Sequence, residues 1–269
     1  MSVGVRRERI LELIRVAGYG AIEDLAGHFR VTPQTIRGDL NLLADAGRLI
    51  RHHGGASIPS SVSNTSYALR RGEFAKQKAL IAQRVAAWLP DRSAVFLSLG
   101  TTMLAVAQAL RMRKELKVIT NNLEAAQILV GQPGIEVIVL GGHLEGRNLG
   151  VSGTSTLAAV EQYRADVCLF SVGGVDREGS LLDYHESEAA VVRAMMRRSR
   201  RSALVIDHSK FGRTASVRVG AITGVAAIAT DQALPPDLRS LLRSHAVEVL
   251  IGAGGDAGAR AAAPRRRRS

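Results

Sequence analysis

The sequence predicts an α/β protein in two parts, a small helical domain at the N-terminus and a larger domain built on a parallel sheet. Of its 269 residues, 46% are hydrophobic and 22% are charged, a balance that suits a chain with a packed core. Helical patterns occupy residues 6–46, whereas short apolar runs alternate with helical stretches from about residue 74. That alternation is typical of parallel strands covered by helices on both faces.

Three helices are predicted in the N-terminal part. The third begins with Thr32 as its cap and Pro33 in the first helical position. Only two residues separate that cap from the second helix, and so short a connection is typical of a helix-turn-helix. The segment 49–55 then predicts a small β-hairpin, or wing. We therefore expect a winged helix-turn-helix at residues 1–57.

The rest of the chain is predicted to contain a linker at 58–73, a large domain at 74–252 and a disordered basic tail at 253–269. The linker is inferred from a serine-rich stretch with no apolar period. Strands of the large domain are expected at 94–99, 117–120, 135–140, 166–172, 203–206, 226–230 and 247–251. Its helices are expected at 76–89 and near 103–110, 123–130, 154–160, 186–198 and 237–244.

Polar or glycine-rich clusters follow five of these expected strands. Loops after parallel strands share one edge of the sheet, where ligands bind. Gly100-Thr101-Thr102 also leads into a helix, whose first N–H groups can hold an anion. Glycines in such loops can equally serve only as turns. Five clusters together favour a ligand cleft over that alternative.

Composition and motifs exclude several other classes of protein. The charge is +12, from 36 basic and 24 acidic residues, and is raised by the tail, so it does not by itself indicate DNA binding. No apolar run is long enough to span a membrane, and no signal peptide is apparent. The single cysteine, Cys168, excludes an internal disulfide and a multi-cysteine zinc site. A dinucleotide fingerprint and a P-loop are both missing. We expect a cytoplasmic protein with no metal and no cofactor.

Ordered motifs run through both predicted domains. Those of the N-terminal part are Arg6-Arg7, Ile10-Leu11, Asp24-Leu25-Ala26, Thr35-Ile36-Arg37, Asp39-Leu40, Gly47 and Arg51-His52-His53-Gly54-Gly55-Ala56. Those of the larger part include Thr120-Asn121-Asn122-Leu123, Asp183-Tyr184-His185-Glu186 and Asp207-His208-Ser209-Lys210-Phe211-Gly212-Arg213. This order resembles the DeoR family of bacterial transcription regulators, and most closely its branch that controls glycerol 3-phosphate metabolism. Residues 74–231 resemble the family's sugar-phosphate sensor, which is related in fold to ribose-5-phosphate isomerase.

The chain departs from the family pattern at four positions. Gly38 stands where a second arginine is usual, and Ala21 where a serine or threonine usually caps the second helix. Ser98 and His143 stand where acidic residues are common. The first two departures concern DNA affinity, and the last two concern the identity of the effector.

The resemblance implies a repressor that binds double-stranded operator DNA and is released by a small phosphorylated polyol, glycerol 3-phosphate. The residues expected to contact DNA are Thr32, Gln34, Thr35, Arg37, Arg51, His52 and His53. Those expected to contact the effector are Gly100, Thr101, Thr102, Asn121, Gly141, Asp183, Glu188 and Lys210. Because operators generally match a two-fold protein, we expect a homo-oligomer, a dimer or a tetramer.

Two alternatives remain open at this point. The chain can be a DeoR-type regulator of another sugar phosphate. It can also be a sugar-phosphate isomerase with an added DNA-binding domain, using Glu188 as a base and Lys210 as its partner. Against the isomerase, Val172-Gly173-Gly174-Val175 lacks the lysine of the loop typical of such enzymes.

Overall fold

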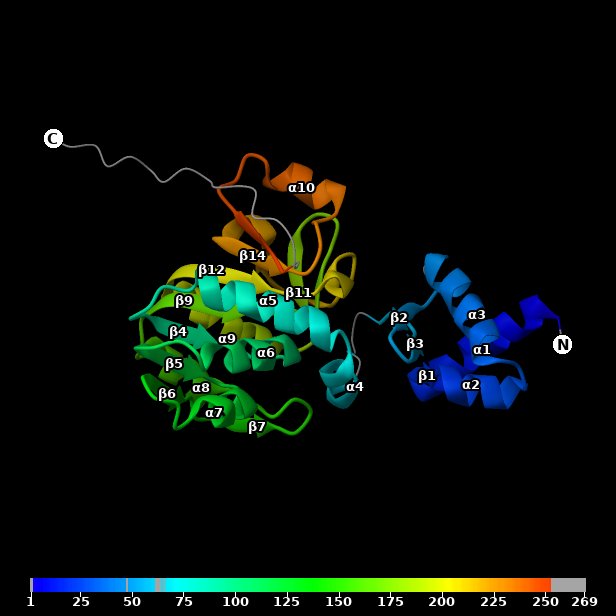
Figure 1. The fold of residues 1–269 in the computed structure, drawn as a ribbon, viewed down its shortest axis with the longest axis horizontal. Coiled ribbons are helices and arrows are strands. Elements are labelled where there is room, and N and C mark those ends of the chain that lie inside the picture. Colours follow the sequence, from blue (N-terminus) through cyan, green and yellow to red (C-terminus); the bar gives the residue numbers. More distant parts are fainter. Residues whose placement is uncertain (1, 47, 61–63, 65, 253–269) are drawn as a thin grey trace.

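A computed structural model describes residues 2–46, 48–60, 64 and 66–252 (Figure 1). The predicted basic tail therefore lies outside the described residues. The N-terminal part contains α1 (Val3–Ala17), β1 (Tyr19–Ala21), α2 (Ile22–Phe29), α3 (Pro33–Asp45), β2 (Ile50–His52) and β3 (Gly55–Ser57). The three strands form an antiparallel sheet in the order β1-β3-β2. The predicted winged helix-turn-helix is confirmed, and β1 is an addition that the sequence analysis missed.

Local chemistry explains where the helices of this domain begin and end. The Thr32 hydroxyl accepts a hydrogen bond from the Thr35 amide at the start of α3. Arg30 ends α2 in the left-handed region, at φ 52°. Ala21 precedes α2 without a side-chain cap, as the sequence indicated. A separate core, which includes Ile10 and Leu40, holds the three helices together.

The larger domain is a seven-stranded sheet in which every neighbouring pair is parallel. Its order is β15-β14-β12-β9-β4-β5-β6. The strands are β4 (Ala94–Leu97), β5 (Leu116–Thr120), β6 (Ile135–Val139), β9 (Ala165–Phe170), β12 (Ser199–Val205), β14 (Ala227–Thr230) and β15 (Glu248–Ile251). Each of the seven overlaps a predicted strand, so the predicted α/β class is confirmed.

Helices cover both faces of this sheet. The helices are α5 (Ala75–Trp88), α6 (Thr101–Leu110), α7 (Leu123–Leu129), α8 (Thr154–Glu161), α9 (Glu186–Arg197) and α10 (Pro236–Leu242). The core on one face joins α5, α6 and α7 to the sheet, and the core on the other joins α8, α9 and α10. Cys168 is fully buried in the second core, where burial raises the pKa of its thiol.

The structure adds short elements around this frame. The strands β7 (His143–Glu145) and β8 (Gly150–Ser152) form a hairpin. A second, antiparallel sheet contains β10 (Gly174–Val175), β11 (Ser180–Asp183) and β13 (Val217–Ala221). Two 3-10 turns, His208–Lys210 and Ile222–Gly224, complete the domain. No helix among the described residues is long and apolar enough to cross a membrane.

A short helix, α4 (Tyr67–Gly72), lies inside residues 58–73, the range predicted as a linker. Ser66 caps it by accepting a hydrogen bond from the Leu69 amide. None of its residues is fully buried, which explains why the sequence shows no apolar period over this helix. Figure 1 shows α4 between the parallel sheet and the wing formed by β2 and β3.

Candidate effector pocket and DNA-binding surface

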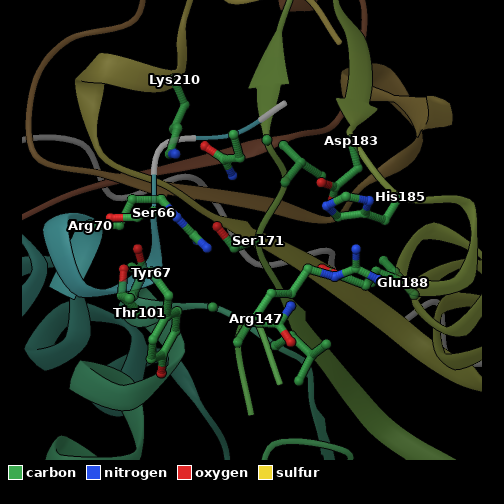
Figure 2. A pocket seen from close by; sticks show the side chains of 18 of the residues that line it. Ser66, Tyr67, Arg70, Thr101, Arg147, Ser171, Asp183, His185, Glu188 and Lys210 are labelled. Atoms are coloured by element: carbon green, nitrogen blue, oxygen red, sulfur yellow. The ribbon is translucent and has the colours of Figure 1, made fainter. Parts of the chain in front are cut away.

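A cavity of about 380 Å³ lies at the carboxyl edge of the parallel sheet (Figure 2). The chain order reverses between β4 and β9, and residues that follow both strands line the cavity. Such a reversal leaves a crevice between neighbouring loops, which is where α/β sheets bind their ligands. The geometry therefore makes this cavity the candidate effector pocket.

One side of the pocket is suited to an anion. Gly100, at φ 122°, turns the chain from β4 into α6, so that Thr101 and Thr102 form the first turn of that helix. Lys210 reaches the pocket from the 3-10 turn after β12. Burial, together with the nearby charges of Arg213 and Arg70, lowers the pKa of Lys210 to about 7. An arriving dianion would favour the charged form of that lysine.

Lys78 of α5 stands behind this anion side. It is buried, and its ammonium donates hydrogen bonds to Thr101 Oγ1, at 3.0 Å, and to the carbonyl oxygen of Arg70. Burial lowers the pKa of Lys78. Lys78 was not predicted as a site residue, although it lies three residues before Ile81 on the apolar face of a predicted helix, which is an unusual place for a lysine.

The opposite side of the pocket carries carboxylates. Asp183 ends β11 and Glu188 lies in the first turn of α9. Burial and the neighbouring Glu188 raise the pKa of Asp183 to about 6, and burial also raises the pKa of Glu188. Arg147, from the turn between β7 and β8, places its Nε 3.5 Å from Glu188 Oε1. Figure 2 shows these side chains across the pocket from Lys210, Arg70 and Thr101.

Three buried oxygens of pocket-lining residues have no hydrogen-bond partner within the described part of the chain. Asn121 donates from Nδ2 to the Val151 carbonyl at 2.9 Å, which leaves its Oδ1 as an unused acceptor. Asn64 Oδ1 and Glu188 Oε1 are the other two, although Arg147 Nε lies 3.5 Å from Glu188 Oε1. Buried polar atoms are nearly always hydrogen-bonded, so unused acceptors in a cavity indicate a ligand with donor groups. Hydroxyl groups provide such donors.

Seven of the eight residues predicted for the effector line this one cavity: Gly100, Thr101, Thr102, Asn121, Asp183, Glu188 and Lys210. Gly141 does not. It lies exposed after β6, and its carbonyl accepts a hydrogen bond from Thr156 Oγ1, so we assign it a turn. The pocket residues that the sequence analysis missed include Ser66, Tyr67, Arg70, Arg147, Ser171 and His185.

The helix α3 presents the predicted DNA-contacting residues on its outer face. Thr32, Gln34 and Arg37 are exposed, and Thr35 is half-buried because it faces the cap. The Arg37 guanidinium lies 3.8 Å from the Glu23 carboxylate, and both side chains are largely exposed. So loose a contact leaves Arg37 available to a partner.

Of the three wing residues predicted to contact DNA, the structure leaves one fully exposed. Arg51 is half-buried and donates to Asn41 Oδ1, at 3.0 Å, and to the Gly55 carbonyl. His53 is exposed. His52 is a correction, because its side chain is fully buried between Ser57 and the residues after α4. A buried ring does not reach a phosphate, so His52 is no longer among the DNA-contacting candidates.

Both parts of the chain match known protein families. Residues 6–62 match the DeoR-like helix-turn-helix domain, and residues 73–232 match the DeoR C-terminal sensor domain. The chain is 41% identical to the glycerol-3-phosphate regulon repressor of Escherichia coli strain K12, over 91% of this chain and 97% of that protein. It is 38% identical to the protein of the same name from Haemophilus influenzae, over 93% and 98%.

A further relative is the HTH-type transcriptional repressor CsqR of Escherichia coli strain K12, at 39% identity over 91% of this chain and 94% of that one. Among solved structures, the ribose 5-phosphate isomerase A of Neisseria gonorrhoeae gives a TM-score of 0.38 at 14% identity, covering 50% of this chain and 52% of that chain. The two domain matches and the long alignments agree in their order along the chain. This protein therefore belongs to the DeoR family of transcription regulators.

Proposed function

We propose that this protein is a transcriptional repressor that binds operator DNA through α3 and leaves it when glycerol 3-phosphate occupies the effector pocket. The family membership supports DNA binding regulated by a sugar phosphate. The repressors of the same name in Escherichia coli and Haemophilus influenzae support the choice of effector. In bacteria, such a regulator would act in the cytoplasm.

The observation that carries the choice of ligand is the division of the pocket into two sides. Thr101, Thr102 and Lys210 offer hydroxyls, helix N–H groups and a positive charge to a phosphate. Asn121 Oδ1 and the carboxylate of Glu188 offer acceptors to the hydroxyl groups of a polyol. A short molecule with an anion at one end and hydroxyls at the other satisfies both sides.

On the DNA side, we assign major-groove or phosphate contacts to Thr32, Gln34, Thr35 and Arg37. Phosphate contacts set position and affinity, whereas contacts to base edges set the choice of sequence. We also propose that the protein acts as a dimer or a tetramer, because a two-fold operator places two recognition helices one turn of DNA apart. Sedimentation of the purified chain at micromolar concentration tests that assembly.

Calorimetric titration tests the choice of effector. Glycerol 3-phosphate should bind the full-length protein, and free glycerol, which lacks the dianion, should bind far more weakly. The same additions should release the protein from a duplex selected from random sequences by the protein itself. Release by a hexose or pentose phosphate in place of glycerol 3-phosphate would leave the repressor assignment standing and replace the effector.

The enzyme alternative has its own measurement. Incubation with ribose 5-phosphate, followed by assay for the ketose, should give no turnover above a buffer control. Turnover by the wild type that is lost in the Glu188→Gln variant would show that the pocket is catalytic, and would overturn the proposal that it only binds an effector.

A further inference from the structure

The segment that joins the two domains takes part in both of them. Asn64 lines the effector pocket and also a second, small cavity of about 50 Å³. The walls of that second cavity include Ile50 and Ser57 from the wing, and Tyr184 and Arg213 from the sensor. Tyr184 directly follows Asp183, which lines the effector pocket. The wing thus rests on the sensor next to the residues that meet the effector.

Helix α4 is fixed to the sensor at two places. Glu124 of α7 accepts hydrogen bonds from Tyr67 and Arg71. The carbonyl of Arg70 accepts a hydrogen bond from Lys78, whose ammonium also donates to Thr101. The second link connects the end of α4 directly to the side of the pocket that suits an anion.

The residue after α4 contacts the wing. Glu73 is buried, and its Oε1 lies 2.6 Å from Nδ1 of the buried His52, although the two atoms lack the alignment of a hydrogen bond. The other ring nitrogen, Nε2, lies 2.8 Å from Ser57 Oγ in β3. The Tyr19 ring packs against the same imidazole, with the ring centroids 5.7 Å apart. His52 therefore joins Glu73 to two strands of the wing.

We propose that the His52–Glu73 contact transmits effector binding from the pocket to the wing. An anion at Thr101 competes for the hydrogen bond that Lys78 gives to Thr101, and it attracts the Arg70 side chain that lines the same pocket. Either change alters the link between Lys78 and the end of α4. Glu73 follows that end directly, so it moves with it.

Both side chains are buried and their nearest atoms lie 2.6 Å apart, so a displacement of Glu73 displaces the His52 ring with it. The wing is therefore expected to follow Glu73, and α3 to follow the wing. An effector shifts an equilibrium between two conformations only if its affinity for them differs. Here the two conformations are those with the wing in its present place and with the wing displaced, and the hydrogen bonds of Lys78 make the affinity of the pocket differ between them. This inference rests on the proposed function, since it assumes an effector that displaces the protein from DNA.

The decisive experiment compares Glu73→Gln with Glu115→Gln in the full-length protein. Glu115 pairs with Arg92 at an exposed site in the sensor, so its variant is a matched control. Affinity for the selected duplex is measured by fluorescence anisotropy with and without saturating glycerol 3-phosphate. The ratio of the affinity without ligand to the affinity with ligand is typically about 5–150 in allosteric coupling. Glu73→Gln should bring the wild-type ratio close to one, and Glu115→Gln should keep it.

Calorimetry of the same variants without DNA should show that glycerol 3-phosphate still binds Glu73→Gln as tightly as wild type, because Glu73 does not line the pocket. His52→Gln should give the same loss of coupling, and the double variant should lose no more than either single one. Equal ratios in wild type and Glu73→Gln would overturn the proposed coupling contact. Failure of glycerol 3-phosphate to release wild type would instead overturn the proposed function.

A measurement on the wild type covers the case in which a variant does not fold. Amide hydrogen exchange is followed in segments 50–57 and 67–78, with and without glycerol 3-phosphate. The expected result is a change of exchange rate in both segments. A change in 67–78 with an unaltered wing would overturn the inference.

Discussion

Arg6 Nε of α1 donates to Asp39 Oδ2 of α3 across 2.6 Å, and Arg7 Nε reaches the other oxygen at 2.8 Å. The Asp39 side chain is only 3% exposed. Burial alone would raise the pKa of this carboxyl, but hydrogen bonds and charge from the two arginines hold the pKa below its usual value. The first helix is thereby fixed to the inner side of α3, the helix proposed to bind DNA.

Asp39→Asn should lower the free energy of unfolding of the N-terminal domain by about 3 kcal/mol, since it leaves two guanidinium groups without their carboxylate. The lone tryptophan, Trp88, lies in the sensor, so urea unfolding followed by circular dichroism and by fluorescence separates the domains. The circular dichroism transition should shift and the fluorescence transition should not. Asp45→Asn, on the exposed end of the same helix, is the control.

The ion pairs of Asp39 with the two arginines also predict that the free energy of unfolding depends on pH. A carboxyl whose pKa is lowered by folding contributes stability above its unfolded pKa, near 3.9, and loses it as the pH falls. The difference in stability between wild type and Asp39→Asn should therefore be full at pH 7 and shrink in acid. A difference that stays constant down to pH 3 would contradict a charge-based role.

Arg37→Ala should weaken binding to the selected duplex by about 1–3 kcal/mol if the side chain contacts a base. If Arg37 meets only phosphate, affinity should fall similarly on all sequences, and the slope of affinity against salt should flatten by about one. A salt titration on specific and random duplexes distinguishes the two. Arg111→Ala, exposed in the sensor, should bind as wild type does. Unchanged binding and slope for Arg37→Ala would exclude the residue from the interface.

Gly38→Arg should bind DNA more tightly than wild type. A Cβ at position 38 would meet no heavy atom within 4 Å, so a side chain fits there without strain. Gly38→Ala separates the two contributions, because it restores about 1 kcal/mol of helix propensity and adds no charge. We expect both variants to melt at a higher temperature and only the arginine to bind more tightly. Weaker binding by the arginine variant would indicate that the α3 backbone approaches DNA closely at this point.

Binding of glycerol 3-phosphate should be coupled to uptake of a proton at pH 8. Lys210, with its pKa lowered to about 7 by burial and by nearby cations, is largely neutral at that pH until a dianion favours its charged form. Affinity should therefore fall as the pH rises from 7 to 9. Titrations in buffers of different ionisation enthalpy measure the uptake.

Lys210→Met is the matched variant for this prediction. It should lose the proton uptake and most of the affinity for the ligand, yet keep its binding to DNA, so that it represses whether or not the effector is present. Normal uptake in this variant would assign the proton to another group.

The polarity of a parallel sheet explains why so much of the pocket was predictable. Thr101, Asn121 and Lys210 follow strands that were recognisable as apolar runs, and parallel strands all end at the same edge. The linear sequence does not reveal Arg70 or Arg147, because they enter the pocket from outside the sheet. Helix α4 and the β7–β8 hairpin, which carry them, have little apolar pattern.

Two predicted site residues lie away from the surfaces to which they were assigned, for local reasons. Gly141 follows a strand as the other pocket residues do, but β6 is an edge strand, so its loop lies at the margin of the sheet. His52 was expected to contact DNA because it lies in the predicted wing. Alternation along β2 turns it inward, and only Glu73, 21 positions later in the chain, completes its surroundings.

The pairing of β4 with β9 has a consequence for the newly made chain. Strand β4 lies inside the sheet, between β5 and β9, and its Val95 can pair with Val167 only after β9 has been synthesised. The winged helix-turn-helix has its own core and needs nothing beyond Ser57 for its last strand. At about 5–20 residues per second, it leaves the ribosome many seconds before the sensor is complete. A transcript cut short between the two domains would therefore encode a DNA-binding fragment with no pocket through which a metabolite could remove it.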